Sequence, residues 1–345
     1  MGVTPGPRVR RRSHLELYLT AVVIVYFAIA SAFMIRHGSF LSPDQFLIVG
    51  LLLALLLAKP LVFLKDWAPF VVLFLGYEYL RGLAPQLGLR VHLTPMISFD
   101  RWLFGGIPTI QLQRALYDPH HLHFYDYVFT VVYMLHFILP LVFAFLIWMR
   151  DRSKYHRFVA ALITLSFAGF ITYMLYPAGP PWMAAQKGLI PPVQDVFATT
   201  LGAFVTPGGV PTVYRIMAPN LVAAMPSLHA AYPFLVYLFL VRFYGKRGHL
   251  FLPYVLLVWV SIVYTGQHYV VDALVGALYA LVTFLVTEYF WRRFFARDQL
   301  ARAAARISVE VRPGPAGAGP GLTSSLQLVQ VGDRPDRTSD PVELP

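Results

Sequence analysis

Long apolar runs alternate along the chain with short segments that carry most of its charge. A helix that crosses the hydrocarbon core of a bilayer needs about 20 mostly apolar residues. Runs of roughly this length lie at 15–35, 46–64, 68–84, 124–149, 157–176, 226–244, 250–266 and 269–291. The pattern therefore predicts an all-α fold, a polytopic transmembrane helix bundle of about eight spans.

Lys and Arg gather in the segments between alternate runs, which is typical of the cytoplasmic side of a membrane protein. These segments are 8–12, a short predicted turn at 65–67, the loops 150–157 and 242–249, and the residues after Trp291. With eight spans all of them fall on one side. We expect a multi-pass protein of the cell (inner) membrane with both termini in the cytoplasm.

The composition agrees with this topology and narrows the function. Hydrophobic residues make up 57% of the chain and charged residues only 13%, whereas soluble domains have about a quarter charged residues. The net charge of +11 would suggest nucleic acid in a soluble protein, but the loop clusters account for it, and we expect no nucleic-acid partner. The absence of Cys excludes disulfides and thiol chemistry.

Two long connections, 85–123 and 177–225, are rich in Pro and Gly and belong to the outer side. Loops of this length usually serve a site, so we expect them to fold over one. We divide the chain into N-terminal spans with an outer loop (1–123), a catalytic helix bundle (124–291) and a tail (307–345). The tail is rich in Pro, Gly, Ser and Asp and is predicted to be disordered and cytoplasmic.

Two polar motifs stand at the predicted outer ends of the last three spans, namely Pro226-Ser227-Leu228-His229 and His268-Tyr269-Val270-Val271-Asp272. The free amides of a helix start attract phosphate, the Ser227 hydroxyl can donate to it, and His229 can give or take a proton. In a helix His268 and Asp272 lie one turn apart, so the carboxylate can orient the ring and leave its other nitrogen nucleophilic. A simple helix cap and a structural His–Asp pair are the alternatives.

Metal chemistry is not indicated by these motifs. His120, His121 and His123 form a loose cluster, but no set of residues has the spacing of zinc ligands. We expect neither a metal nor another cofactor.

Together the motifs resemble the type 2 phosphatidic acid phosphatase superfamily. Its Pro-Ser-x-His signature is matched by Pro226, Ser227 and His229, and its His-x-x-x-Asp signature by His268 and Asp272. The resemblance implies that His268 attacks phosphorus to form a phosphohistidine and that Asp272 orients it. It also implies that His229 protonates the leaving group and then activates the acceptor.

Two departures from the superfamily narrow the resemblance. Ile262 stands where the third signature usually has Arg, and the first signature is absent. The block Tyr176-Pro177-Ala178-Gly179-Pro180-Pro181-Trp182 is instead similar to the branch of fungal inositol phosphorylceramide synthases and their bacterial relatives. A phosphate monoester carries close to two negative charges and a phosphodiester one, so losing a guanidinium weakens binding of the monoester most. This favours a phosphodiester donor.

Several other polar residues are candidates for binding the substrate: Ser227, Arg215, Asn220, Asp126 and His136. Arg215 and Asn220 lie in the outer loop that leads to the first motif. Asp126 and His136 share one stripe of the fourth run with Tyr133, which could face a headgroup or simply satisfy buried polarity. The alternative for Arg215 is that it is a solvated charge in the loop and does not bind the substrate.

The sequence thus predicts a membrane enzyme, a histidine-dependent lipid phosphotransferase or phosphatase. It would move a phosphorylated headgroup, such as phosphoinositol, from a phospholipid to a lipid alcohol at the extracytoplasmic face. Its partners would be the phospholipid donor, the lipid alcohol or water as acceptor, and membrane lipids. The alternatives are a phosphatase acting on polyprenyl or diacylglycerol phosphate and, in another class, a non-catalytic lipid transporter or scaffold.

Overall fold

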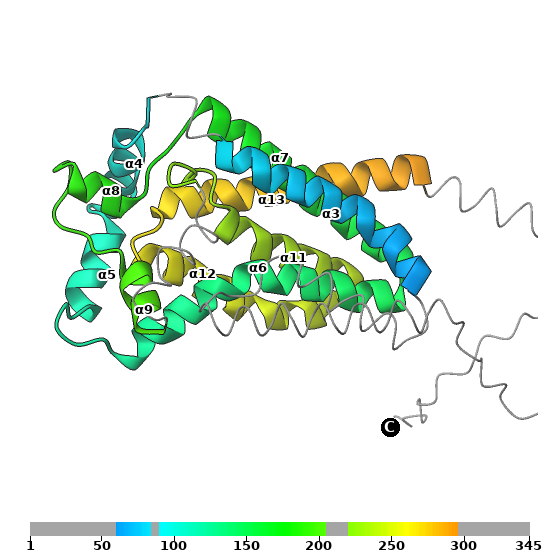
Figure 1. Ribbon diagram of the computed structural model, residues 1–345, viewed down its shortest axis with the longest axis horizontal. Helices are drawn as coiled ribbons and strands as arrows, with labels where there is room; N and C mark the ends of the chain where they lie inside the picture. The colour runs from blue at the N-terminus through cyan, green and yellow to red at the C-terminus, as the bar shows by residue number, and fades with distance from the viewer. Residues whose placement is uncertain (1–59, 84–89, 205–219, 296–345) are drawn as a thin grey trace, which may run out of the picture. The chain divides into compact units, whose positions relative to one another are not determined.

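The computed structural model describes residues 60–83, 90–204 and 220–295, and these residues form helices and no strand (Figure 1). The first expected span, most of the second and the expected tail at 307–345 lie outside the described residues. So does Arg215.

Six longer helices make up the bundle: α3 Pro60–Leu83, α6 Phe124–Arg150, α7 Arg152–Leu175, α11 Leu228–Tyr244, α12 Leu252–Tyr264 and α13 Val270–Phe290. A 3-10 segment, Gly245–Phe251, joins α11 to α12, and a π-helical turn, Trp291–Phe295, follows α13. By length and composition, four stretches of the described chain could cross a membrane: Phe124–Arg150, Arg152–Leu175, Leu228–Tyr264 and Val270–Phe294. An all-α membrane protein is confirmed, and the number of eight spans stays a prediction.

The predicted turn at 65–67 is wrong, because α3 runs through it without a break. The charge in this segment serves helix packing instead of a turn. Asp66 is buried and accepts hydrogen bonds from Trp148 Nε1 at 2.9 Å and from Arg152 Nε at 2.6 Å. An acidic residue paired in this way is compatible with a helix interior.

The expected loop 150–157 is also much shorter than predicted. Asp151 alone separates α6 from α7. Its side chain accepts hydrogen bonds from Ser153 N at 2.9 Å and from Lys154 N at 3.1 Å, which caps the start of α7. Because Asp151 satisfies these amides, the basic residues that follow it belong to the first turns of α7.

Helix α11 lies at the centre of the bundle and packs against α6, α7, α12 and α13 (Figure 1). Its inner face combines small residues such as Ala230 and Ala231 with large ones such as Leu235 and Phe239, and all four are fully buried. Aromatic rings of α3, α6 and α7 extend this core, with Trp67 stacked 5.2 Å from Phe63. The bundle therefore holds the start of α11 firmly from several sides.

The two long connections contain the short helices α4 Thr94–Phe104, α5 Pro108–Leu116, α8 Pro181–Gln186 and α9 Val196–Phe204. In Figure 1 these four gather at the end of the bundle where α13 begins. Isolated bridges tie the connections together, linking Ala178 to His92 and to Ala223. A second apolar cluster forms beneath them, from residues such as Met96, Ile97 and Trp182.

The opposite end of the bundle carries a cluster of charges around Glu288 near the end of α13. Glu288 bonds to Arg157 of α7 and to Arg242 of α11 at 2.9 Å, and Arg292 lies 3.8 Å away. The Glu288 side chain is only 7% exposed. One buried carboxylate thus ties together the ends of three helices.

Candidate active site

The starts of α11 and α13 bring the two sequence motifs together. Ser227 is the N-cap of α11, and its Oγ accepts a hydrogen bond from Ala230 N at 3.3 Å. His229 is the second residue of α11. The Ser227 amide donates to the carbonyl oxygen of Asp272 on α13 at 3.0 Å. The backbones of the two motifs are therefore joined directly.

Gly276 permits this close approach of α11 and α13. A Cβ atom at this position would lie 2.2 Å from the carbonyl oxygen of Ser227. Such a distance is far inside van der Waals contact, and backbone is on both sides of it. Only glycine fits where α13 passes the N-cap of α11.

His268 stands in the short turn between α12 and α13. Gly266 in this turn has a φ of +78°, a region that favours glycine, and a Cβ there would lie 2.6 Å from Gln194 O. The His268 amide donates to Ile262 O at 3.1 Å, which folds the turn back onto α12. The turn thus delivers His268 to the first residues of α13 with a fixed backbone.

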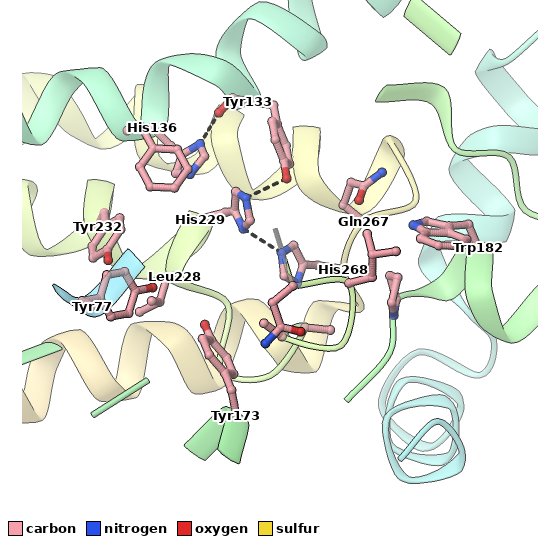
Figure 2. A pocket seen from close by; sticks show the side chains of 16 residues that line it. Tyr77, Tyr133, His136, Tyr173, Trp182, Leu228, His229, Tyr232, Gln267 and His268 are labelled. Atoms are coloured by element: carbon pink, nitrogen blue, oxygen red, sulfur yellow. Dashed lines mark hydrogen bonds between the residues drawn. The ribbon is translucent and has the colours of Figure 1, made fainter. Parts of the chain in front are cut away.

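Four side chains form a row across the site: Asp272, His268, His229 and Tyr133. Figure 2 shows the last three of them. Asp272 Oδ2 lies 3.5 Å from His268 Nδ1. His268 Nε2 is 2.9 Å from His229 Nδ1, and His229 Nε2 is 2.6 Å from the Tyr133 hydroxyl. Asp272 is fully buried and accepts a further bond from Tyr269 N at 2.9 Å. The residues that the two motifs predicted as catalytic therefore lie in contact.

Residues of α4 and α5 hold the backbone around His268. Asp100 Oδ2 and Oδ1 accept hydrogen bonds from Val270 N at 3.0 Å and from Val271 N at 3.1 Å. Asp100 thereby satisfies two free amides at the start of α13, where the helix dipole favours a negative charge. Gln113 Nε2 donates to Tyr264 O at 2.8 Å at the end of α12. The outer helices thus fix both sides of the turn.

Asp100 is fully buried, and this burial is the main influence on its pKa. Loss of hydration raises the pKa of Asp100 to about 6, the two backbone hydrogen bonds oppose this rise, and the charge of Asp272 adds to it. Asp100 therefore gains or loses its proton near pH 6, well above the pKa of an ordinary aspartate.

An open pocket with about 570 Å³ of unfilled space adjoins the row of side chains. Figure 2 places His229 and His268 in its middle, with Tyr77, Tyr232 and Tyr173 to one side and Gln267 and Trp182 to the other. No Lys or Arg is found among the described residues that line the pocket.

The structure places two of the predicted substrate-binding residues at the pocket. Asn220 is 8% exposed, and its Oδ1 accepts from Val222 N at 3.0 Å. Its Nδ2 has no hydrogen-bond partner among the described residues. His136 lines the pocket with its ring 4.2 Å from that of His229, and its Nδ1 contacts Tyr133 O.

Asp126 and Ser227 serve helix starts in this structure. Asp126 Oδ2 accepts from His123 N at 2.7 Å, which caps α6, and its Oδ1 accepts from the Tyr264 hydroxyl. Neither Asp126 nor Ser227 is among the residues that line the pocket, and both are fully buried. Their assignment as substrate contacts stays a prediction. The bonds they make are those of the alternatives, a helix cap for Ser227 and satisfied buried polarity for Asp126.

No group of three or more His, Asp or Glu side chains in the described ranges is arranged to hold a metal ion. His121 and His123 stack edge to face, with ring centres 5.1 Å apart.

Comparison with known families now adds to this geometry. The model of the PAP2 superfamily, the type 2 phosphatidic acid phosphatase family, matches residues 94–286, which is more than half of the chain. The chain belongs to the PAP2 superfamily. The match begins at α4, so the outer helices that hold His268 are part of the PAP2 region.

Curated relatives place the chain near one branch of the PAP2 superfamily. The phosphoinositol dihydroceramide synthase of Bacteroides thetaiotaomicron is 28% identical over 66% of this chain and 80% of its own length. The inositol phosphorylceramide synthase of Candida albicans is 26% identical over 45% of this chain and 34% of its own length. The catalytic subunit of the same enzyme from Saccharomyces cerevisiae is 28% identical over 36% and 32%. No solved structure matches the chain. The resemblance to this branch is confirmed.

Ile262, at the position where the PAP2 superfamily usually has Arg, lies in apolar surroundings. Ile262 is fully buried in a cluster with Val132 and Val258. The preceding Ser261 donates to Phe129 O at 2.6 Å, so it ties α12 to α6. A guanidinium at 262 would have to enter an apolar core, which is costly without a partner.

Two PAP2 site residues escaped the sequence reasoning in part. Tyr133 was assigned only to a polar stripe, although its hydroxyl contacts His229 directly. Asp100 was not among the residues predicted to form the site. An acidic residue inside an otherwise apolar short helix was the available signal for Asp100, because such a group needs a partner.

Proposed function

We propose that this chain transfers a phosphorylated headgroup, phosphoinositol in the first instance, from a phospholipid to a lipid alcohol through a phosphohistidine on His268. The contact of His268 Nε2 with His229 Nδ1 at 2.9 Å, beside the buried Asp272, carries the proposal. A nucleophile, an acid–base group and an orienting carboxylate in contact are the parts that covalent phosphoryl transfer needs. The names of the curated relatives support the same reaction class.

In the first step His268 Nε2 attacks phosphorus, and the bond from phosphorus to the glycerol oxygen of the donor breaks. Protonated His229 gives its Nδ1 proton to that oxygen, and diacylglycerol leaves. In the second step the acceptor hydroxyl attacks phosphorus, His229 takes its proton, and the phosphorus–nitrogen bond breaks. Since 2.9 Å leaves no room for a phosphoryl group, the bond between the two histidines opens as the donor binds.

The charge of the pocket favours a phosphodiester as the donor. None of the described pocket residues is a cation, and Ile262 lies in the core instead of the family's arginine. The absence of a cation weakens binding of a singly charged phosphodiester less than binding of a nearly dianionic monoester. Asn220 Nδ2 is the amide that we propose as a donor to a headgroup or phosphate oxygen, with Arg215 as a cation from the segment outside the described residues.

The arrangement of charge supports an extracytoplasmic active site with both termini in the cytoplasm. His229 is at the start of α11 and His268 just before α13, at the bundle end where α4, α5, α8 and α9 gather (Figure 1). Arg150, Arg157, Arg242 and Arg292 belong to the opposite ends of their helices. Basic residues at one end of a bundle mark the cytoplasmic side.

Headgroup transfer in lipid vesicles tests the proposal. Full-length protein receives labelled phosphatidylinositol or labelled phosphatidic acid, with ceramide or diacylglycerol as acceptor. A new phosphoinositol lipid, together with acid-labile label on the protein, is expected for the wild type and not for His268→Ala. Release of inorganic phosphate from phosphatidic acid alone would replace this proposal by the phosphatase. Lipid binding that survives His268→Ala, without any turnover, would favour the scaffold.

A further inference from the structure

We infer that Tyr133 is a positioning residue for His229, which keeps Nδ1 of that ring turned toward the reacting phosphoryl group. This inference rests on the proposed function for the role of His229, but its geometry is independent of the substrate. Tyr133 belongs to α6, and its hydroxyl lies 2.6 Å from His229 Nε2 (Figure 2). It acts through His229 and needs no contact with the substrate.

The direction of the two hydrogen bonds among His268, His229 and Tyr133 follows from the position of Asp272. In its ionised form the Asp272 carboxylate can only accept, so the proton of neutral His268 belongs on Nδ1, which faces it at 3.5 Å. His268 Nε2 is then an acceptor, and the proton of neutral His229 belongs on Nδ1. His229 Nε2 is therefore the acceptor of the Tyr133 hydroxyl. The reverse order would set a bare ring nitrogen against the Asp272 carboxylate.

Substrate binding makes the bond from Tyr133 more important. When a phosphoryl group enters, the bond between His268 and His229 opens, whereas the bond from Tyr133 to Nε2 is retained on the far side of the ring. A hydroxyl can also accept, so Tyr133 bonds to Nε2 both when His229 is neutral and when it is protonated. The same partner thus serves His229 as acid in the first step and as base in the second.

Tyr133 is itself held rigidly. It is 2% exposed, and its ring lies 4.4 Å from that of Phe197 on α9. Its ring and that of His136 lie 4.6 Å and 4.2 Å from the His229 ring. A fixed hydroxyl can orient an imidazole, whereas a mobile one would follow it.

The test compares Tyr133→Phe with the wild-type full-length protein in the transfer assay. A positioning role predicts a kcat lower by about 10- to 100-fold, because small misplacement of a catalytic group is costly, with KM within about twofold. Tyr279→Phe is the matched control. This substitution also removes one hydroxyl hydrogen bond, in which the Tyr279 hydroxyl lies 2.8 Å from Thr172 Oγ1. Tyr279 is not among the residues that line the pocket, so the variant is expected to keep the wild-type kcat.

A second readout follows the hydrogen bond to His229 Nε2 without turnover. Nitrogen chemical shifts of labelled histidine, assigned with His229→Gln, are expected to place the proton of His229 on Nδ1 in both proteins and to show the Nε2 signal moving in Tyr133→Phe, where that nitrogen loses its donor. An unchanged kcat in Tyr133→Phe with an active wild type overturns the inference and leaves the proposed function intact. An inactive wild type with the expected change of the Nε2 signal leaves Tyr133 in its role and removes the proposed function.

Discussion

Gly276→Ala is expected to lower activity far more than stability, because this glycine sets the distance between the two helix starts that carry the proposed catalytic histidines. The new Cβ would lie 2.2 Å from Ser227 O and 3.1 Å from the Ser227 carbonyl carbon. Backbone cannot rotate out of the way, so the start of α11 has to retreat by about 1 Å. His229 is two residues beyond Ser227 and moves with it, which widens its 2.9 Å contact with His268.

Two magnitudes decide the outcome. Overpacking of a core costs about 1–3 kcal/mol, and exchange of helical Gly for Ala returns about 1 kcal/mol, so the net loss of stability is about 0–2 kcal/mol. A displacement of about 1 Å at a catalytic group lowers the rate by about 100-fold. The variant should therefore fold and insert but turn over slowly.

The assay measures kcat for headgroup transfer and the thermal unfolding midpoint of the same preparation. Gly76→Ala in α3 is the matched control, since its Cβ would meet no atom of the described residues within 4 Å. We expect wild-type kcat for Gly76→Ala and a loss of about 100-fold for Gly276→Ala. A Gly276→Ala enzyme within about threefold of the wild type would refute the reasoning that α11 and α13 fix the catalytic distance.

Three further perturbations test other contacts. Burial raises the pKa of Asp100 to about 6, so the contribution of Asp100 to stability is present at low pH and lost as the pH rises through about 6. The stability advantage of wild type over Asp100→Asn, measured by thermal unfolding, should therefore shrink from pH 4 to pH 7. A constant difference would contradict this. Ser227→Ala should lower stability by about 1 kcal/mol through loss of the cap and leave KM unchanged, whereas a tenfold rise in KM would reveal a substrate contact. Glu288→Ala should cost about 3–5 kcal/mol, because Arg157, whose side chain is only 12% exposed, loses its partner. Unaltered denaturant unfolding would exclude that role.

Local spacing was sufficient to predict the centre of the site. His268 and Asp272 are one helical turn apart, and His229 stands at another helix start, so each motif could be placed without knowing the fold. The bundle followed from apolar runs in the same way. The helix starts at 228 and 270 lie within two residues of the predicted ones.

The patterns were ambiguous where a polar residue had two possible uses. The charged segment 65–67 was predicted as a turn, but the buried pairing of Asp66 with Arg152 keeps this segment inside α3. Asp126 shares a stripe with His136, yet ten residues of helix separate them by about 15 Å along the axis. Periodicity gives the face of a helix and not the depth at which a pocket opens.

Contacts over long sequence separation could not be predicted at all. Tyr133 and His229 are 96 residues apart, and Asp100 is 170 residues from Val270. No local pattern connects such pairs, because the rotation and register of packed helices decide which side chains meet. These are the contacts that complete the site around the motif residues.

The hydrogen bonds from Asp100 to the start of α13 also bear on the order in which the protein is made. The ribosome synthesises α4 well before α13. The Asp100 carboxylate on α4 therefore has no backbone amides of α13 to bind until α13 has been made. His268, which we propose as the nucleophile, is placed only when the last long helix of the described chain is made. A nascent chain that stops before residue 268 would contain most of the residues that line the pocket but not this histidine, so under the proposed mechanism it would be inactive during insertion.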